Sequence, residues 1–151
     1  MTKAFVGLRK LEVALILGLV ALTVAFVASM FTTSDRWVRL TSLTVFDAQA
    51  GQVPRITYDR EFIRDFPGHW LVEVWRINRG QPEAGCPQDG EWNYRKAKPS
   101  QDQDLLWLLG DDDKCLPKEP GFYFVAVHLT VNPGTILART ATIQSNIFEV
   151  R

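Results

Sequence analysis

The residues of this chain that could carry chemistry are few, and two of them are its only cysteines, Cys86 and Cys115. A redox pair would favour closer spacing, such as C-x-x-C, and a zinc site needs more ligands than two cysteines and two distant histidines supply. In an oxidising compartment two such cysteines pair, and closing a loop of about 30 residues is worth roughly 3.5 kcal/mol in the chain-entropy description. We therefore predict a Cys86–Cys115 disulfide, with two unpaired thiols as the alternative.

Three consecutive aspartates, Asp111–Asp113, precede the second cysteine. Carboxylate clusters suit calcium, but the spacing does not follow an EF-hand loop and Lys114 is adjacent, which favours a solvated loop. The two histidines, His69 and His128, belong to no recognisable triad, and His128 is expected to point outward from its strand.

Other catalytic signatures are missing from the sequence. There is no G-x-S-x-G turn and no glycine-rich phosphate loop. A carboxylate pair for glycoside cleavage depends on geometry that a sequence does not give, so a hydrolase stays open as an alternative. We predict a chain that is not an enzyme, with no catalytic residue, metal or cofactor.

The chain has five tryptophans, and their positions suggest a second kind of site. Trp92, Tyr94 and Trp107 fall between the two cysteines. They form either a small core that packs on the disulfide or an aromatic contact surface for a partner protein or a sugar. Trp37 is either an interfacial anchor or a core residue of the first strand.

These residues must be positioned by two kinds of element, of which the first is an apolar N-terminal run. Residues 13–34 carry no charge, and a helix of that length spans about 33 Å, which is enough to cross a bilayer core of about 30 Å. Lys3, Arg9 and Lys10 precede the run and favour a cytoplasmic N-terminus. We predict a cytoplasmic tail at 1–12, a transmembrane signal anchor at 13–34 and a periplasmic domain at 35–151, placing the protein in the inner membrane.

A cleaved signal peptide is the main alternative to the anchor. Cleavage after Ala25 or Ser29 is compatible with the residues there, but the apolar stretch exceeds the 7–15 residues typical of a signal peptide. Either way the remainder of the chain is exported. Basic and acidic residues both number 17, so the charge balance does not indicate a nucleic-acid partner. The sequence does not determine the oligomeric state.

The second kind of element is the β-strand. Alternating and β-branched runs separated by breakers predict about seven strands and an all-β, two-sheet sandwich. Pro67-Gly68 is expected to be a turn, 59–66 a connection or a continued strand, and 105–109 a helix or a strand. Loops are expected at 79–90, 97–104 and 110–119. The predicted strands cover 37–46, 53–58, 69–78, 91–96, 122–131, 136–143 and 146–150.

The segment Gly121-Phe122-Tyr123 resembles the tyrosine corner of immunoglobulin-like sandwiches, in which a tyrosine hydroxyl ties down a turn. The resemblance implies this role for Tyr123. In antibody-type domains a cysteine follows two residues after that tyrosine, whereas here Val125 stands there. The Cys86–Cys115 bridge would therefore staple loops and not clamp two sheets.

A second resemblance spans residues 36–151. The residues that carry it are Asp59, Arg60, Phe66, Pro67, Gly68, His69, Trp70, Val72, Glu73, Val74, Cys86, Tyr94, Trp107, Cys115, Leu116, Pro117, Gly121, Ser145 and Asn146. This pattern resembles small exported proteins encoded by phages and prophages of Gram-negative bacteria. The resemblance implies a membrane-anchored binding or scaffold module with a protein partner, in a role such as lysis control or superinfection exclusion. The alternatives are a virion-associated structural protein, a secreted binding domain and a hydrolase.

Overall fold

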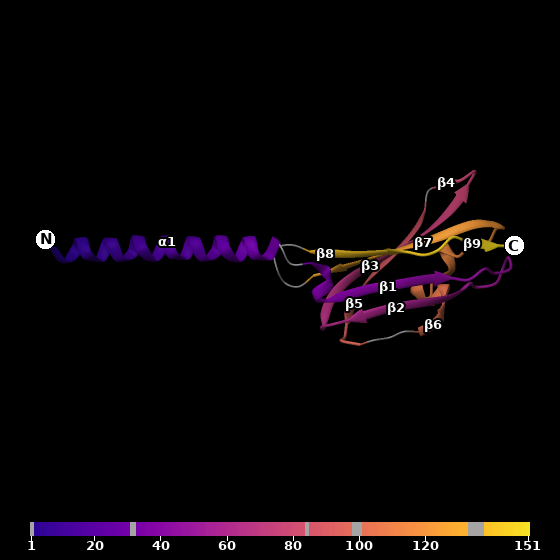
Figure 1. Cartoon of the computed structure of the whole chain (residues 1–151), viewed down its shortest axis with the longest axis horizontal. Coiled ribbons are helices and arrows are strands. Elements are labelled where there is room, and N and C mark those ends of the chain that lie inside the picture. The colour runs from indigo at the N-terminus through magenta and orange to yellow at the C-terminus, as the bar shows by residue number, and fades with distance from the viewer. Residues whose placement is uncertain (1, 31–32, 84, 98–100, 133–137) are drawn as a thin grey trace. The chain divides into compact units, whose positions relative to one another are not determined.

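The computed structural model describes the backbone of residues 2–30, 33–83, 85–97, 101–132 and 138–151 (Figure 1). Contacts divide the chain into two units, one containing the N-terminal helix and one containing the strands.

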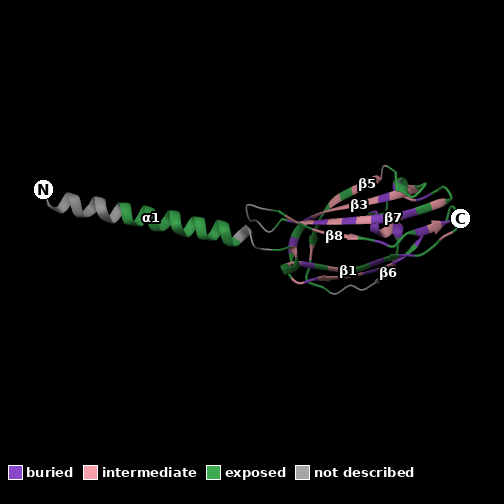
Figure 2. Cartoon of the chain, turned by 45° about the horizontal axis from the view of Figure 1, so that its top comes forward, coloured by how far each residue is buried: buried purple, intermediate pink, exposed green. Residues whose placement is uncertain are grey.

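The helical unit contains α1, Thr2–Met30. The segment lacks proline and is rich in leucine, alanine and valine, which explains its continuity. Side chains 12–28 are exposed throughout (Figure 2). The structure does not support the predicted transmembrane helix at 13–34, since across the part of the chain that it describes no helix combines the length and the apolar character needed to cross a membrane.

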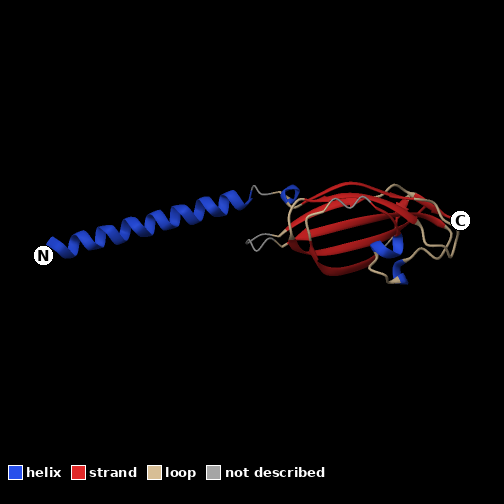
Figure 3. Ribbon diagram, turned by 90° about the horizontal axis from the view of Figure 1, so that it is seen from below, coloured by secondary structure: helices blue, strands red, loops and turns tan. Residues whose placement is uncertain are grey.

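The β unit contains two antiparallel sheets (Figure 3). The smaller sheet has the order β1-β2-β6. In the larger sheet β3 and β7 pair centrally, β4 and β5 flank β3, and β8 and β9 flank β7. The strands are β1 Val38–Val45, β2 Arg55–Phe62, β3 Phe66–Asn78, β4 Gln81–Pro82, β5 Cys86–Tyr94, β6 Gln101–Asp104, β7 Gly121–Val131, β8 Arg139–Gln144 and β9 Phe148–Val150.

The two sheets bury their inner faces in two apolar clusters, as the strand alternation predicts. On β7 every second residue from Tyr123 to Val131 is buried. The first cluster contains Tyr123, Val125 and Val127 of β7 together with Ile56 and Tyr58 of β2. A second cluster is formed by Val38, Phe62, Phe66, Leu129 and Val131. The predicted β-rich, two-sheet fold is thus confirmed.

The predicted turn at Pro67-Gly68 is wrong, because both residues lie inside β3. Pro67 pairs with Asn93 of β5, and Gly68 pairs with Trp92. A side chain at Gly68 would approach Phe66 and Tyr94 to 3.1 Å. The glycine is therefore explained by close packing between strands and not by a turn.

The predicted loop at 79–90 is also wrong for most of its length. A two-residue turn at Arg79 (φ 51°) and Gly80 (φ 78°) joins β3 to β4, and β5 then begins at Cys86. Positive φ at both central residues is the geometry of a tight hairpin turn, which residue composition alone describes only as a loop.

Three further segments correct or complete the predicted elements. Strand β2 continues to Phe62, so residues 59–62 extend the second strand. The predicted polar loop at 97–104 ends in β6, which pairs with β2. The undecided segment at 105–109 forms helix α2, Leu105–Leu108, over most of its length. At the start of this helix the Asp104 carboxylate accepts a hydrogen bond from the Trp107 backbone N–H at 2.8 Å.

Short 3₁₀ helices η1 (Ser34–Arg36) and η2 (Asp113–Cys115) complete the described elements.

The turn before β7 has the hydrogen bond that the tyrosine-corner resemblance predicts. The Tyr123 hydroxyl donates to the Glu119 carbonyl oxygen, four residues earlier, at 2.8 Å. Arg76 reinforces the turn through the Glu119 carboxylate at 2.6 Å and the Pro120 carbonyl oxygen at 3.2 Å.

Candidate ligand-binding pocket

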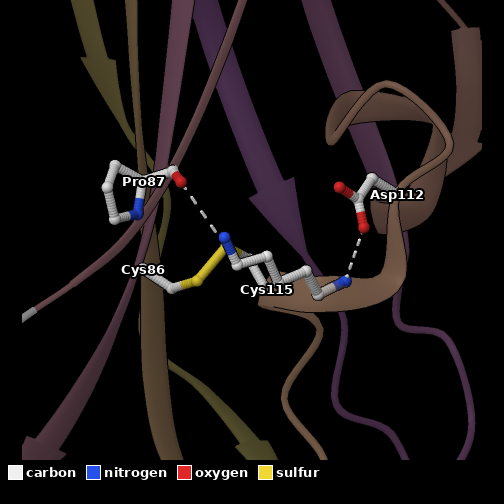
Figure 4. Close-up of a disulfide and its surroundings, with 5 residues drawn as sticks. Cys86, Pro87, Asp112 and Cys115 are labelled. Atoms are coloured by element: carbon white, nitrogen blue, oxygen red, sulfur yellow. Dashed lines mark hydrogen bonds between the residues drawn. A yellow bond between two sulfur atoms is a disulfide. The ribbon is translucent and has the colours of Figure 1, made fainter.

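The predicted disulfide is confirmed, and it holds one wall of a pocket in place. Cys86 opens β5, and Cys115 ends η2, with the two Cα atoms 5.4 Å apart (Figure 4). Asp112 stabilises η2 by accepting a hydrogen bond from the Lys114 backbone N–H at 3.0 Å. The bridge thereby fixes the segment that follows α2 against the start of β5.

A pocket of about 510 Å³ lies among four strands and α2. This volume is within the range of small-molecule sites. Three of the five tryptophans lie in its lining, together with two of the three tyrosines. The lining residues are Tyr58, Arg60, Trp70, Val72, Gly90, Glu91, Trp92, Tyr94, Trp107, Leu108, Gly110, Asp111, Val127 and Leu129.

Arg60 occupies an inward-facing position of β2. Tyr58 and Phe62, two residues on either side, are buried core residues, so alternation directs all three side chains to the same face. The guanidinium carbon lies 4.9 Å from the ring centroids of Tyr58, Phe62 and Trp107. A cation in a core-facing row is unusual, and here three aromatic faces surround it.

The protonation states of the pocket follow from its burial. Burial lowers the pKa of Arg60, and the phenols of Tyr58 and Tyr94 partly oppose this effect. Because an arginine starts from a very high pKa, the side chain stays a cation. Burial also raises the pKa of Tyr58 and of Tyr94 to about 12 in each case. At neutral pH the pocket therefore presents one cation beside two neutral phenols.

Two glycines make room for the indole of Trp70. A side chain at Gly90, which pairs with Trp70 across the sheet, would approach the indole to 2.9 Å. A side chain at Gly110, which has φ +70°, would approach it to 3.1 Å. The pocket wall therefore depends on glycine at both positions.

The aromatic residues that the sequence singled out are brought together in the lining, but not as a core packed on the disulfide. Trp92 is 67% exposed. Tyr94 packs on Phe62 at 4.9 Å and Phe66 at 5.1 Å between ring centroids, in the second core cluster. Of these three residues only Trp107 packs against the cluster that contains Cys115 and contacts Cys86. Trp37 is partly buried against the second cluster, which favours the core interpretation for it.

The sequence patterns did not indicate Arg60, Tyr58 and Trp70 as members of this site. A signal is present in the alternation from Ile56 to Phe62, where an arginine interrupts an otherwise apolar inner row. The signal is obscured because residues 59–66 are compatible with a connection as well as with a strand.

The acidic run and the histidines form no metal-binding cluster. Asp113 pairs with Lys118 at 3.5 Å. His69 pairs with Asp89 at 2.8 Å, and His128 pairs with Glu73 at 3.3 Å. Over the described residues no group of three or more potential ligands could hold a metal ion. The sequence matches no model of a known protein family and no curated protein.

Proposed function

We propose that this chain is a membrane-anchored binding module that presents the aromatic pocket outside the cytoplasm. The observation that carries the proposal is the pocket itself: about 510 Å³, lined by three tryptophans and by Arg60. Concave sites rich in aromatic side chains, with a few placed polar groups, are the usual form of a small-molecule site.

The groups in the pocket suit binding better than catalysis. Neither phenol can act as a base near neutral pH, because each has a pKa of about 12. The two acidic residues of the lining, Glu91 and Asp111, are both exposed. Indole, phenol and guanidinium groups supply stacking surfaces and hydrogen-bond donors.

The anchor and the compartment are part of the same proposal. The anchor rests on the sequence: residues 13–34 form an uncharged run, most of which α1 covers, and the cations Lys3, Arg9 and Lys10 before it favour a cytoplasmic N-terminus. The disulfide supports an oxidising compartment, which for an exported domain of a Gram-negative bacterium is the periplasm. The Tyr123 hydrogen bond supports an immunoglobulin-like classification of the two-sheet unit.

The biological setting rests on the sequence resemblance alone. A phage-encoded module would serve lysis control or exclusion of competing phages, with another protein as its partner. A virion-associated protein and a secreted domain released by cleavage are the competing assignments.

A topology experiment tests the anchor. Fusions of alkaline phosphatase and of green fluorescent protein to Arg151 should give an active phosphatase and a dark fluorescent protein in cells. The cell membrane fraction should retain the full-length chain after a high-salt wash. A cytoplasmic C-terminus with both thiols reduced would overturn the export proposal, and a mature N-terminus near residue 26 or 30 would favour the secreted alternative.

A ligand screen tests the pocket. The full chain in mild non-ionic detergent has five indole N–H signals, and three of them come from Trp70, Trp92 and Trp107. Members of a library of small polar aromatics, sugars and organic acids that bind should shift these three signals and leave those of Trp37 and Trp75 unchanged. A library in which nothing moves the pocket signals would contradict the proposed binding function.

A further inference from the structure

The Arg60 guanidinium has a hydrogen bond with the Tyr58 hydroxyl but no carboxylate partner among the residues that the structure describes, so part of its bonding capacity stays open. Its neighbours along β2, Asp59 and Glu61, are directed to the opposite face by strand alternation. Glu61 pairs with Arg39 at 3.6 Å. Among the described residues no carboxylate forms an ion pair with Arg60.

A guanidinium that has no carboxylate partner within the protein can donate hydrogen bonds to a carboxylate of a ligand. Ring faces compensate its positive charge but do not replace the paired acceptors that its planar fork of N–H donors fits. A carboxylate binds such a fork through two parallel hydrogen bonds, which are among the stronger ones in proteins. The inner end of the pocket therefore favours an anionic group.

The remaining lining specifies the body of the ligand. Trp70 and Trp107 are partly buried, and Trp92 is largely exposed, so flat apolar surface extends from the interior to the mouth. Asp111 also lines the pocket and is exposed, so its carboxylate can accept hydrogen bonds from hydroxyl groups. Glu91 alternates with Gly90 and Trp92 on β5, so its side chain is directed to the face of the sheet away from Arg60.

We propose that the pocket binds a sugar acid, with its carboxylate on the Arg60 guanidinium, its ring against the tryptophans and its hydroxyl groups toward Asp111. A sugar acid is the ligand class that combines an anionic group, a ring face and several hydroxyl donors. This inference rests on the proposed binding function and narrows it to a chemical class.

Trigalacturonic acid and its methyl ester are matched probes, because the ester keeps the sugar skeleton and removes the charge. With the full chain in detergent, the acid should shift the indole signals of Trp70, Trp92 and Trp107. The ester should bind about tenfold more weakly or worse, since a charge-assisted hydrogen bond is lost. Added salt should weaken binding of the acid but leave that of the ester unchanged.

Variants of Arg60 test whether its guanidinium is the group that binds the ligand carboxylate. Arg60→Gln should lower affinity for the acid about tenfold and leave affinity for the ester unchanged, whereas Arg60→Lys should lose less because it keeps the charge. Arg55→Gln is the matched control, since Arg55 lies on the same strand, is exposed and is outside the pocket lining. Each variant should retain the dispersed indole spectrum of the native chain.

The outcomes separate this inference from the proposed function. Equal affinity for acid and ester overturns the sugar-acid assignment and leaves the binding function intact. The same holds if neither sugar binds while another library compound shifts the pocket signals. If no compound of any kind shifts them, both proposals fail.

Discussion

The side chain of Asn146 takes the place of a strand partner for Val45. The Val45 N–H donates to Asn146 Oδ1 at 2.8 Å, and Asn146 Nδ2 donates to the Val45 carbonyl oxygen at 2.9 Å. Val45 ends β1 in the smaller sheet, and Asn146 lies between β8 and β9 in the larger one. One carboxamide thus connects the two sheets through both backbone groups of a buried residue.

Asn146→Ala is expected to lower the free energy of unfolding by about 1–3 kcal/mol, because two hydrogen bonds are lost and the backbone of Val45 is left without partners. Chemical denaturation of the full chain in detergent measures the change. Asn93→Ala removes an exposed asparagine side chain from β5 and should cost no more than about 0.5 kcal/mol. Equal costs for the two variants would show that the Val45 contacts contribute nothing.

The disulfide is expected to contribute roughly 3.5 kcal/mol to stability, since it closes a loop with a sequence separation of 29 residues. A Cys86→Ser/Cys115→Ser variant should unfold at correspondingly lower urea concentration. Adding a thiol reductant should destabilise the native chain by a similar amount and leave the double variant unchanged. A reductant effect on the double variant would show that the loss has another source.

The sequence predicts a strand well where the alternation of apolar and polar residues along that strand alone shows which face is buried. Strand β7 is an example, because its inner row from Tyr123 to Val131 is apolar at every second residue. Strand β5 is the opposite case: its sequence CPQDGEWNY has weak strand propensity, and pairing with β3 defines it. Pairing partners are far apart in the chain, so local composition indicates a strand only at 91–96 and describes residues 86–90 as part of a loop.

The candidate site also has some features that the local sequence predicts and others that depend on strands far apart in the chain. The disulfide is predictable from cysteine count and compartment, and the aromatics between the cysteines mark one wall of the pocket. Arg60 comes from β2 in the smaller sheet and Trp70 from β3 in the larger sheet, and the sequence does not specify how the two sheets face each other. The space that Gly90 leaves for the Trp70 indole likewise depends on the pairing of β5 with β3, which local sequence does not show.

The tyrosines of the pocket should ionise late. Because the pKa of Tyr58 and of Tyr94 is raised from 10.0 to about 12, the folded state holds their protons more tightly than the unfolded state does. Their contribution to stability is complete below pH 10 and is lost as the pH rises from 10 to 12. Ultraviolet titration should show phenolate absorbance near pH 12 in the native chain and near pH 10 in urea.

The matched variant for this titration is Tyr58→Phe. It should reduce the fall in unfolding free energy between pH 10 and 12, because one of the two late-ionising phenols is gone. Native tyrosines that all titrate near pH 10 would contradict the burial of these side chains.

Gly90→Ala tests the contact that shapes the pocket wall. The new methyl group would meet three atoms of the Trp70 indole at 2.9 Å, so the ring must shift, at an expected cost of about 1–3 kcal/mol. The cost should be much smaller in a Trp70→Leu background, because a shorter side chain leaves room for the methyl group. Gly18→Ala, where a side chain meets nothing within 4 Å, should leave unfolding of the β unit unchanged. An equal cost of Gly90→Ala in both backgrounds would mean that the glycine is required for a reason other than the indole, and the account of the pocket wall would then be wrong.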